Sequence, residues 1–244
     1  MKPTLDLERK ARSRSTEPLT ILGIDEVGTG AWAGPVVVAA VAFEDDESKL
    51  PIAVRDSKKL TGIKRLDLLP DILRDAITFG IGIVTPEQID DMGMSAARDK
   101  AMIEAFNDAK KGYTGPRCVA VVDGRNLKKL RDKLGGKYAM FVNKADRLSY
   151  SVAAASIVAK VTRDGIMAEL AEKYKGYGFE SNVGYGTKQH AVALDKLGPC
   201  YIHRFSTKPV RKVVQAIAEE EENTKIRQGT KEKGRESQEE PITS

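Results

Sequence analysis

Four carboxylates stand where predicted buried segments end, and they are the residues best suited to chemistry in this chain. Asp25 and Glu26 follow one apolar run. Asp123 ends a second apolar run, and Asp146 precedes a long helical pattern. A buried carboxylate is costly unless it is paired or bound to a metal, so a meeting of the four would suit hard divalent cations, which prefer oxygen ligands. Two such ions about 4 Å apart can assist an in-line phosphoryl displacement.

Each acid taken alone also has an ordinary structural interpretation. Asp123 precedes a glycine, a pair that is typical of a turn after a strand. Asp146 could cap a helix, and the pair at the end of the first run could be a solvated strand end. Because successive residues of a regular strand face opposite sides, Asp25 and Glu26 converge only if the strand ends or twists there. The glycine-rich turn that follows them favours such an end.

Buried strands and helices must position these acids. Residues 19–24, 35–43 and 118–124 are nearly continuous apolar runs, typical of strands that are buried on both faces. A helical pattern covers residues 94–110, and another follows Asp146. Strands that come first and then alternate with helices indicate an α/β fold, a mixed sheet with helices on both faces. Ligand sites in such sheets gather at strand ends, where the acids are placed.

The charge balance favours a polyanionic partner. The chain has 244 residues and a formal net charge of +5. Residues 219–244 carry eight Glu and five Lys or Arg, so the remainder of the chain carries +8. A basic globular part of this kind suits nucleic acid.

Cysteine use and hydropathy indicate a cytoplasmic protein. Cys118 and Cys200 are too few for a disulfide framework or a tetrahedral zinc site, and we expect both to be reduced thiols. The N-terminal sequence is charged and has no apolar signal core. No apolar stretch approaches the roughly 20 residues that cross a bilayer. We therefore expect no membrane association.

Several motifs, taken together and in order, resemble bacterial ribonuclease HII, the type 2 ribonuclease H family. They extend from about residue 20 to residue 212 and so cover most of the chain. The motifs are GIDEVGTGAWAGPVVVAAV from residue 23, DSKKL at 56–60, VVDG at 121–124, KADRLSYSVAAASIVAKVTRD at 144–164, GYGTKQH at 184–190 and IHRFSTKPV at 202–210.

The resemblance implies a ribonuclease H-like mixed sheet flanked by helices, with a small C-terminal helical extension. We expect the catalytic core to cover residues 19–175 and the extension to cover 176–218. The polar composition outside these bounds suggests a flexible leader over residues 1–18 and a disordered charged tail over 219–244. A monomer is expected.

The implied activity is endonucleolytic cleavage of the RNA strand in RNA–DNA hybrids, together with incision of duplex DNA at embedded ribonucleotides, a DNA repair reaction. Products would carry 5′-phosphate and 3′-hydroxyl ends. Carried over by position, Asp25, Glu26, Asp123 and Asp146 match the family's catalytic, metal-binding acids. The resemblance implies Mg²⁺ or Mn²⁺, with two ions when substrate is bound.

A glycine segment is implied to read the ribose. Gly28, Thr29 and Gly30 occupy the place of the family's Gly-Arg-Gly segment, which senses the 2′-hydroxyl group. Backbone amides can still reach the sugar here, but Thr29 removes a charge-assisted contact to phosphate. This departure concerns substrate affinity and preference, because it leaves every catalytic acid in place.

Three further residues are assigned by the resemblance. Tyr185 matches the tyrosine that packs on the sugar beside the ribonucleotide, and Lys58 falls in a motif whose lysine contacts backbone phosphate. Asp164 follows an arginine in the long helix, and we expect only an accessory role for it. Asn182 and Val183 replace the His-Lys that often precedes the Gly-Tyr pair, which removes another positive group.

Two weaker signals remain open. The two histidines, His190 and His203, are expected on a helix surface or in packing. A basic run after Asp123 could track phosphate, in which case affinity falls steeply with salt, or it could be a solvated surface. The run consists of Lys128, Lys129, Arg131, Lys133 and Lys137.

Two rival functions are compatible with the same residues. A DNA nuclease or resolvase on the same core would cut duplexes that lack any ribonucleotide. A binding module would recognise hybrids without cutting them; the four acids argue against this alternative, whereas Thr29 keeps it open.

Overall fold

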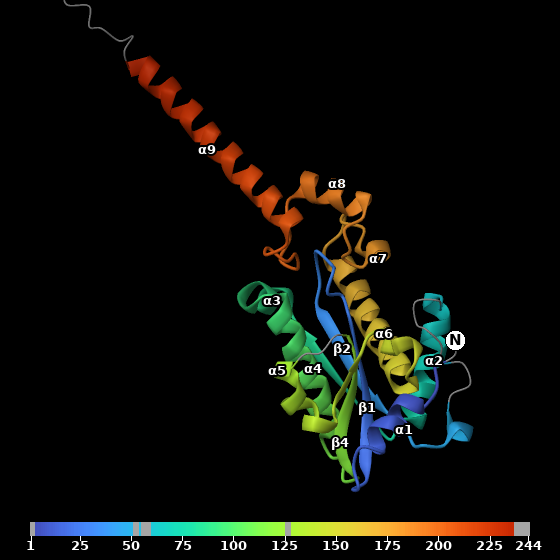
Figure 1. Cartoon of the computed structure of the whole chain (residues 1–244). Helices are drawn as coiled ribbons and strands as arrows, with labels where there is room; N and C mark the ends of the chain where they lie inside the picture. The colour runs from blue at the N-terminus through green and yellow to red at the C-terminus, as the bar shows by residue number, and fades with distance from the viewer. Residues whose placement is uncertain (1–2, 51–53, 55–59, 125–127, 237–244) are drawn as a thin grey trace, which may run out of the picture.

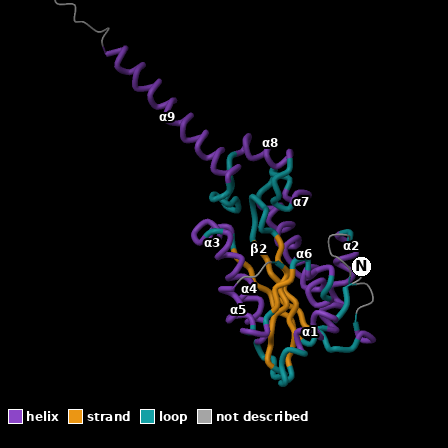
Figure 2. The backbone as a smooth tube through the Cα atoms, viewed as in Figure 1, coloured by secondary structure: helices purple, strands orange, loops and turns teal. Residues whose placement is uncertain are grey.

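The computed structural model describes residues 3–50, 54, 60–124 and 128–236. Lys58, one of the predicted substrate contacts, lies outside these residues. A mixed sheet forms the centre of the molecule, with helices on both of its faces (Figures 1 and 2). This arrangement confirms the predicted α/β fold class.

Among the described residues, five strands make up the sheet, in the order β3-β2-β1-β4-β5. The first three pair antiparallel, whereas β4 runs parallel to β1 and β5 runs parallel to β4. The predicted apolar runs correspond to strands, and β2 is buried along its whole length. The strands are β1 (Leu19–Val27), β2 (Val36–Ala42), β3 (Thr78–Val84), β4 (Arg117–Asp123) and β5 (Met140–Val142).

Two long helices cover the two faces of the sheet. Helix α4 (Met94–Lys110) packs its alanine-rich side on one face, and α6 (Tyr150–Lys173) packs on the other. The small residues in the first turns of α6 allow close approach to the sheet. Gly23 of β1 lies directly against the α6 backbone at Ser151, where a Cβ atom would have no room. The helix that follows Asp146 is therefore held tightly against the central strand.

The other helices lie around this core, except for the long C-terminal helix, which projects away from it (Figure 1). Within the described ranges, no helix combines the length and the apolar character needed to cross a bilayer. The helices are α1 (Asp6–Arg12), α2 (Gly62–Asp75), α3 (Pro86–Met92), α5 (Lys128–Arg131), α7 (Phe179–Asn182), α8 (Lys188–Leu197) and α9 (Lys208–Glu236).

The N-terminal region differs from the flexible leader suggested by its composition. Leu5, Glu8 and Ala11 are fully buried around α1. The Glu8 carboxylate accepts hydrogen bonds from the Ser149 hydroxyl at 2.7 Å and from the Ser151 amide at 2.8 Å. These contacts explain the difference, because they give one carboxylate oxygen of the buried acid two donors and connect α1 to the N-terminal end of α6.

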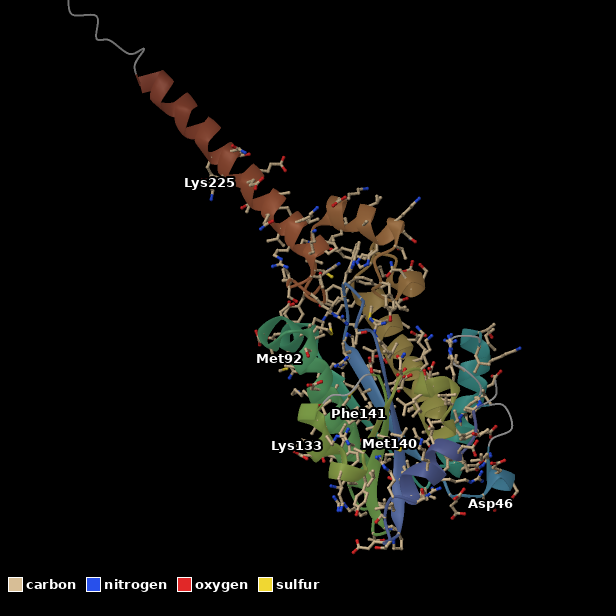
Figure 3. The ribbon with its side chains drawn as sticks, viewed as in Figure 1. Asp46, Met92, Lys133, Met140, Phe141 and Lys225 are labelled. Carbon is tan, nitrogen blue, oxygen red and sulfur yellow. The ribbon has the colours of Figure 1, made fainter. Side chains whose placement is uncertain are left out.

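The C-terminal helices form an extension beyond the sheet. Phe179 of α7 and Ala193 of α8 pack with Met167, near the end of α6. Helix α9 projects away from the body (Figure 1), and its Lys225 side chain lies in open surroundings (Figure 3). The helix continues to Glu236, so helical structure extends past residue 218, where the disordered tail was expected to begin.

Candidate active site

The predicted acids of β1 and β4 meet at one edge of the sheet. The two strands are parallel neighbours, and Ile24 pairs with Val122. Asp123 ends β4, and Asp25 lies beside it two residues before β1 ends at Val27, because β1 continues through the acidic pair instead of ending there. A cavity of about 300 Å³ opens there and contains Asp25, Glu26 and Asp123 in its lining.

The rest of the cavity lining comes from distant segments of the chain. Four segments contribute to it: the β1–β2 loop, α2, α6 and the loop before α8. The cavity therefore combines acids, backbone glycine, cations and an aromatic ring. The other lining residues are Val27, Gly28, Thr29, Arg65, Ser156, Lys160 and Tyr185.

Asp146 lies beside this cavity but is not part of its lining. It belongs to the short 3-10 turn η5 (Ala145–Arg147) and has no exposed surface. The Ala145 amide donates a 2.8 Å hydrogen bond to Asp123 Oδ1, which joins this turn to the end of β4. In the part of the chain that the structure describes, no three Asp, Glu, His or Cys side chains form a group that could hold a metal. The structure thus brings three acids into one cavity and places Asp146 next to it.

Burial and mutual repulsion set the charge state of these acids. Burial raises the pKa of Asp25 to about 8, the neighbouring charges of Glu26 and Asp123 add to that rise, and a hydrogen bond with Ser156 opposes it. The Glu26 amide also donates to Asp25 Oδ1 at 2.9 Å. In the absence of a cation, the cavity therefore favours a proton on Asp25 at neutral pH.

Two cations of the cavity were not foreseen from the sequence. Lys160 of α6 and Arg65 of α2 line it, and both interact with Asp164. Lys160 Nζ lies 2.6 Å from Asp164 Oδ1, and Arg65 Nη1 lies 3.9 Å from Asp164 Oδ2. Asp164, predicted to be accessory, thus holds two basic groups beside the acids. Lys160 is far along the sequence from Asp25 and Asp123, the acids whose cavity it lines, so only the fold reveals its place beside them.

Two buried arginines hold the glycine-containing loop. Arg163 donates to the carbonyl oxygens of Pro35 at 2.9 Å and Val183 at 2.9 Å. Arg204 donates to Gly34 at 2.8 and 2.9 Å and to Ala31 at 2.9 Å. Both side chains are fully buried, and sequence reasoning missed their role because their acceptors are backbone groups distant in the sequence.

The conformation of the loop requires glycine at position 28. Gly28 has a φ of +92°, in the region that favours glycine. A Cβ atom here would also meet the Arg163 side chain and the Pro35 carbonyl. Thr29 lines the cavity beside it. Gly30, the third residue of the predicted segment, is not among the lining residues.

Tyr185 also lines the cavity. The guanidinium of Arg163 lies 5.3 Å from the ring centroid, within cation–π range. One arginine therefore contacts both the loop after β1 and the tyrosine. The predicted substrate contacts at residues 28, 29 and 185 share a cavity with three of the four acids, those of β1 and β4.

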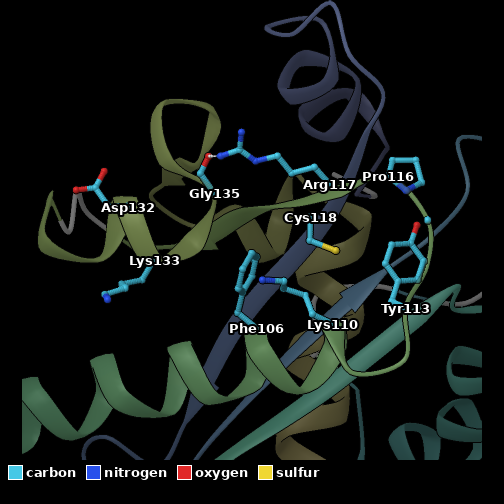
Figure 4. A pocket seen from close by; sticks show the side chains of 10 residues that line it. Phe106, Lys110, Tyr113, Pro116, Arg117, Cys118, Asp132, Lys133 and Gly135 are labelled. Atoms are coloured by element: carbon cyan, nitrogen blue, oxygen red, sulfur yellow. Dashed lines mark hydrogen bonds between the residues drawn. The ribbon is translucent and has the colours of Figure 1, made fainter.

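A second cavity, of about 280 Å³, lies at the other end of β4 (Figure 4). Lys110, Arg117 and Lys133 contribute to its lining, and Asp132 is its acidic residue. It contains none of the four predicted catalytic acids. Part of the basic run thus lies at the end of the sheet remote from them, and phosphate tracking by that run stays a prediction.

Comparison with known proteins assigns the family. A family model described as Ribonuclease HII matches residues 22–210. The chain belongs to the ribonuclease HII family. The Ribonuclease HII of Parvibaculum lavamentivorans is 43% identical to it over 207 residues, which cover 82% of this chain and 70% of that relative.

Solved structures agree with this assignment. The crystal structure of ribonuclease H2 from Pyrococcus horikoshii OT3 matches with a TM-score of 0.67 and 27% identity, and covers 81% of this chain and 98% of that one. The structure of Bst-RNase HIII in complex with Mn²⁺ matches with a TM-score of 0.62 over 84% of this chain and 72% of that one. Its 17% identity supports the fold alone.

Membership of the ribonuclease HII family confirms the predicted activity class. The protein is a hydrolase, an endonuclease of the ribonuclease H type that degrades the RNA of RNA–DNA hybrids. The ribonuclease H-like fold predicted from the ordered motifs is confirmed as well.

Proposed function

We propose that the protein also incises duplex DNA at embedded ribonucleotides, and that both reactions are metal-assisted and leave 5′-phosphate and 3′-hydroxyl ends. One observation supports this most directly. The acids of β1 and β4 line the same cavity as Gly28, Thr29 and Tyr185. Hydrolytic groups and ribose-reading groups thus face one small volume.

The donor chemistry of the cavity fits divalent cations. Asp25, Glu26, Asp123 and Asp146 would hold Mg²⁺ or Mn²⁺, two ions in the presence of substrate, and all offer oxygen ligands. When bound, such ions activate the attacking water and stabilise the leaving 3′-oxygen. The raised pKa of Asp25 supports this fit, because crowded buried carboxylates need either a proton or a cation.

The remaining groups would orient the nucleic acid. Lys160 and Arg65 bring positive charge to the cavity, where a phosphate beside the scissile bond could accept their hydrogen bonds. The backbone at Gly28 can approach the sugar closely, and the Tyr185 ring supplies a flat surface against it. Because the 2′-hydroxyl distinguishes RNA from DNA, these two contacts would select the cleavage position.

A single gel assay tests the proposal. The substrate is an end-labelled DNA duplex that contains one ribonucleotide, incubated with Mg²⁺ or Mn²⁺. We expect one incision next to the ribonucleotide. Asp25→Asn should abolish it while binding of an RNA–DNA hybrid largely survives, and the exposed Asp195→Asn serves as the matched control.

The rival functions give different results in the same assay. Incision of an all-DNA duplex of the same sequence would favour a DNA nuclease or resolvase. If the protein binds an RNA–DNA hybrid but forms no cleavage product, the result would favour a binding module. Near-normal turnover by Asp25→Asn would remove the assignment of the catalytic acids.

We also propose that the protein acts as a cytoplasmic monomer. Cys118 and Cys200 are free thiols, which suits a reducing compartment. Sedimentation equilibrium at micromolar concentration should give the mass of one chain, and a concentration-dependent rise to twice that mass would contradict the monomer.

A further inference from the structure

The two histidines of the chain form a buried pair behind the loop that carries Tyr185. His190 lies on α8, and His203 lies between α8 and α9. Both are fully buried, and their Nε2 atoms are 3.1 Å apart. The packing alternative expected from the sequence therefore applies, but the two rings also make polar contacts that packing alone does not require.

The neighbouring backbone groups determine where each ring carries its proton. Two backbone groups of Cys200 lie near His203 Nδ1, the amide at 2.9 Å and the carbonyl oxygen at 3.2 Å. We assign the shorter contact, and because an amide N–H can only donate, Nδ1 then accepts. The proton of neutral His203 is then on Nε2 and is donated to His190 Nε2. His190 carries its own proton on Nδ1 and donates it to the Tyr185 carbonyl oxygen at 2.9 Å.

The surroundings keep both rings neutral. Aromatic rings of Trp32, Tyr177 and Phe179 pack against the pair at centroid distances of 4.9 to 5.7 Å. Burial lowers the pKa of His203 to about 4, with a further contribution from His190, and burial also lowers the pKa of His190. A directed chain of hydrogen bonds therefore runs from the Cys200 amide to Tyr185.

Tyr185 is held at several points, and the histidine chain provides one of them. The Tyr185 carbonyl oxygen also accepts a hydrogen bond from the Thr187 amide at 2.9 Å. The Tyr185 amide donates to the Asn182 backbone carbonyl oxygen at 2.9 Å. Arg163 contacts its ring. The bond from His190 adds a side-chain contact to the link between this loop and α8, which Thr187 caps, and through His203 it reaches the segment that leads into Arg204.

We propose that His190 and His203 are positioning residues that set the Tyr185 ring at the substrate cavity. The inference rests on the proposed function, in which Tyr185 contacts the sugar of the substrate. The histidines themselves do not line the cavity. They act through the Tyr185 backbone, so that the wrong tautomer of either ring would break the chain.

The first test uses the unmodified protein. Because the chain contains only two histidines, ¹⁵N-histidine labelling reports this pair alone. At pH 7 we expect two neutral imidazoles of opposite tautomers, one protonated on Nδ1 and the other on Nε2. Two rings protonated on the same nitrogen, or a charged ring at this pH, would overturn the proposed chain.

The second test compares two variants of one position. An asparagine at position 190 can place an amide N–H near the site of Nδ1, whereas a glutamine reaches the site of Nε2 instead. His190→Asn should therefore keep the bond to Tyr185, and His190→Gln should lose it. We expect kcat/KM on a single-ribonucleotide duplex to fall roughly 3- to 10-fold in His190→Gln, the size of one net hydrogen bond. Equal values for the two variants would contradict the proposal.

A double-mutant cycle shows whether the effect passes through the tyrosine. Tyr185→Ala should lower kcat/KM, and adding His190→Gln to it should cause no further loss. If the loss from His190→Gln persists unchanged in the Tyr185→Ala background, the positioning role is wrong while the proposed function stands. If Tyr185→Ala itself cleaves like the unmodified protein, the proposed substrate contact fails, and the inference fails with it. If His190→Gln does not fold, the labelling experiment alone decides.

Discussion

Replacing Asp25 with asparagine should stabilise the metal-free protein while it abolishes cleavage. The Asp25 carboxyl has a pKa of about 8 in the folded protein, raised from 3.8 mainly by burial. Between these values the folded state holds a proton that the unfolded chain has released. Stability therefore falls as pH rises through this interval, by about 1.4 kcal/mol per pH unit, and levels off above the folded pKa.

The size of the effect follows from that slope. From pH 3.8 to pH 7 the accumulated loss is about 4 kcal/mol. Asparagine has no proton to release, so the variant avoids this loss. For a chain of this length, 1 kcal/mol shifts Tm by roughly 2–4 °C, so we expect a rise on the order of 10 °C at pH 7.

Thermal unfolding in EDTA at pH 5 and pH 8 measures the effect. The Tm of Asp25→Asn should exceed that of the unmodified protein by more at pH 8 than at pH 5. The exposed Asp195→Asn variant should show no such difference. Added Mg²⁺ should raise the Tm of the unmodified protein and leave that of Asp25→Asn nearly unchanged. An Asp25→Asn variant that is less stable than the unmodified protein at pH 8 in EDTA would refute the reasoning.

Three further substitutions test separate parts of the site. Gly28→Ala should destabilise the protein by about 1–3 kcal/mol in urea unfolding, because its positive φ and the neighbouring Arg163 leave no place for a Cβ atom; unchanged stability would contradict this. Glu8→Ala should cost about 1–3 kcal/mol by the same measurement, since Ser149 and the α6 N-terminus lose their acceptor; a neutral result would mean that α1 does not secure α6. Lys160→Ala should raise KM roughly 10-fold and flatten its salt dependence, as expected for a lost phosphate contact; an unchanged KM and salt slope would exclude that contact.

The sequence already contained most of the information about the acids. Asp123 could be placed at the end of a strand, and Asp25 close to one, because an apolar run followed by glycines is a local pattern. The order of the motifs then indicated the family and with it the fold. The fold keeps these local patterns because β1 and β4 are buried along most of their length, so that polar side chains are accommodated only near their C-terminal ends.

Local patterns were less informative at the ends of the chain. Residues 6–12 have a polar composition that suggests a flexible leader, yet Glu8 is buried and caps another helix. The bonds that order this segment join residues about 140 positions apart. No short-range periodicity records such a partner.

The sequence by itself determined which residues could do chemistry, which segments would be buried and which family the chain resembles. Only the tertiary structure decided that β1 and β4 are parallel neighbours and that Lys160 and Arg65 line the cavity. It also decided that the two histidines contact each other and that His190 hydrogen-bonds to the Tyr185 carbonyl oxygen. The physical reason is that these features depend on pairings between distant segments. Residue type and spacing specify what a side chain can do, whereas its charge state, its tautomer and its partner depend on the environment that the whole fold creates.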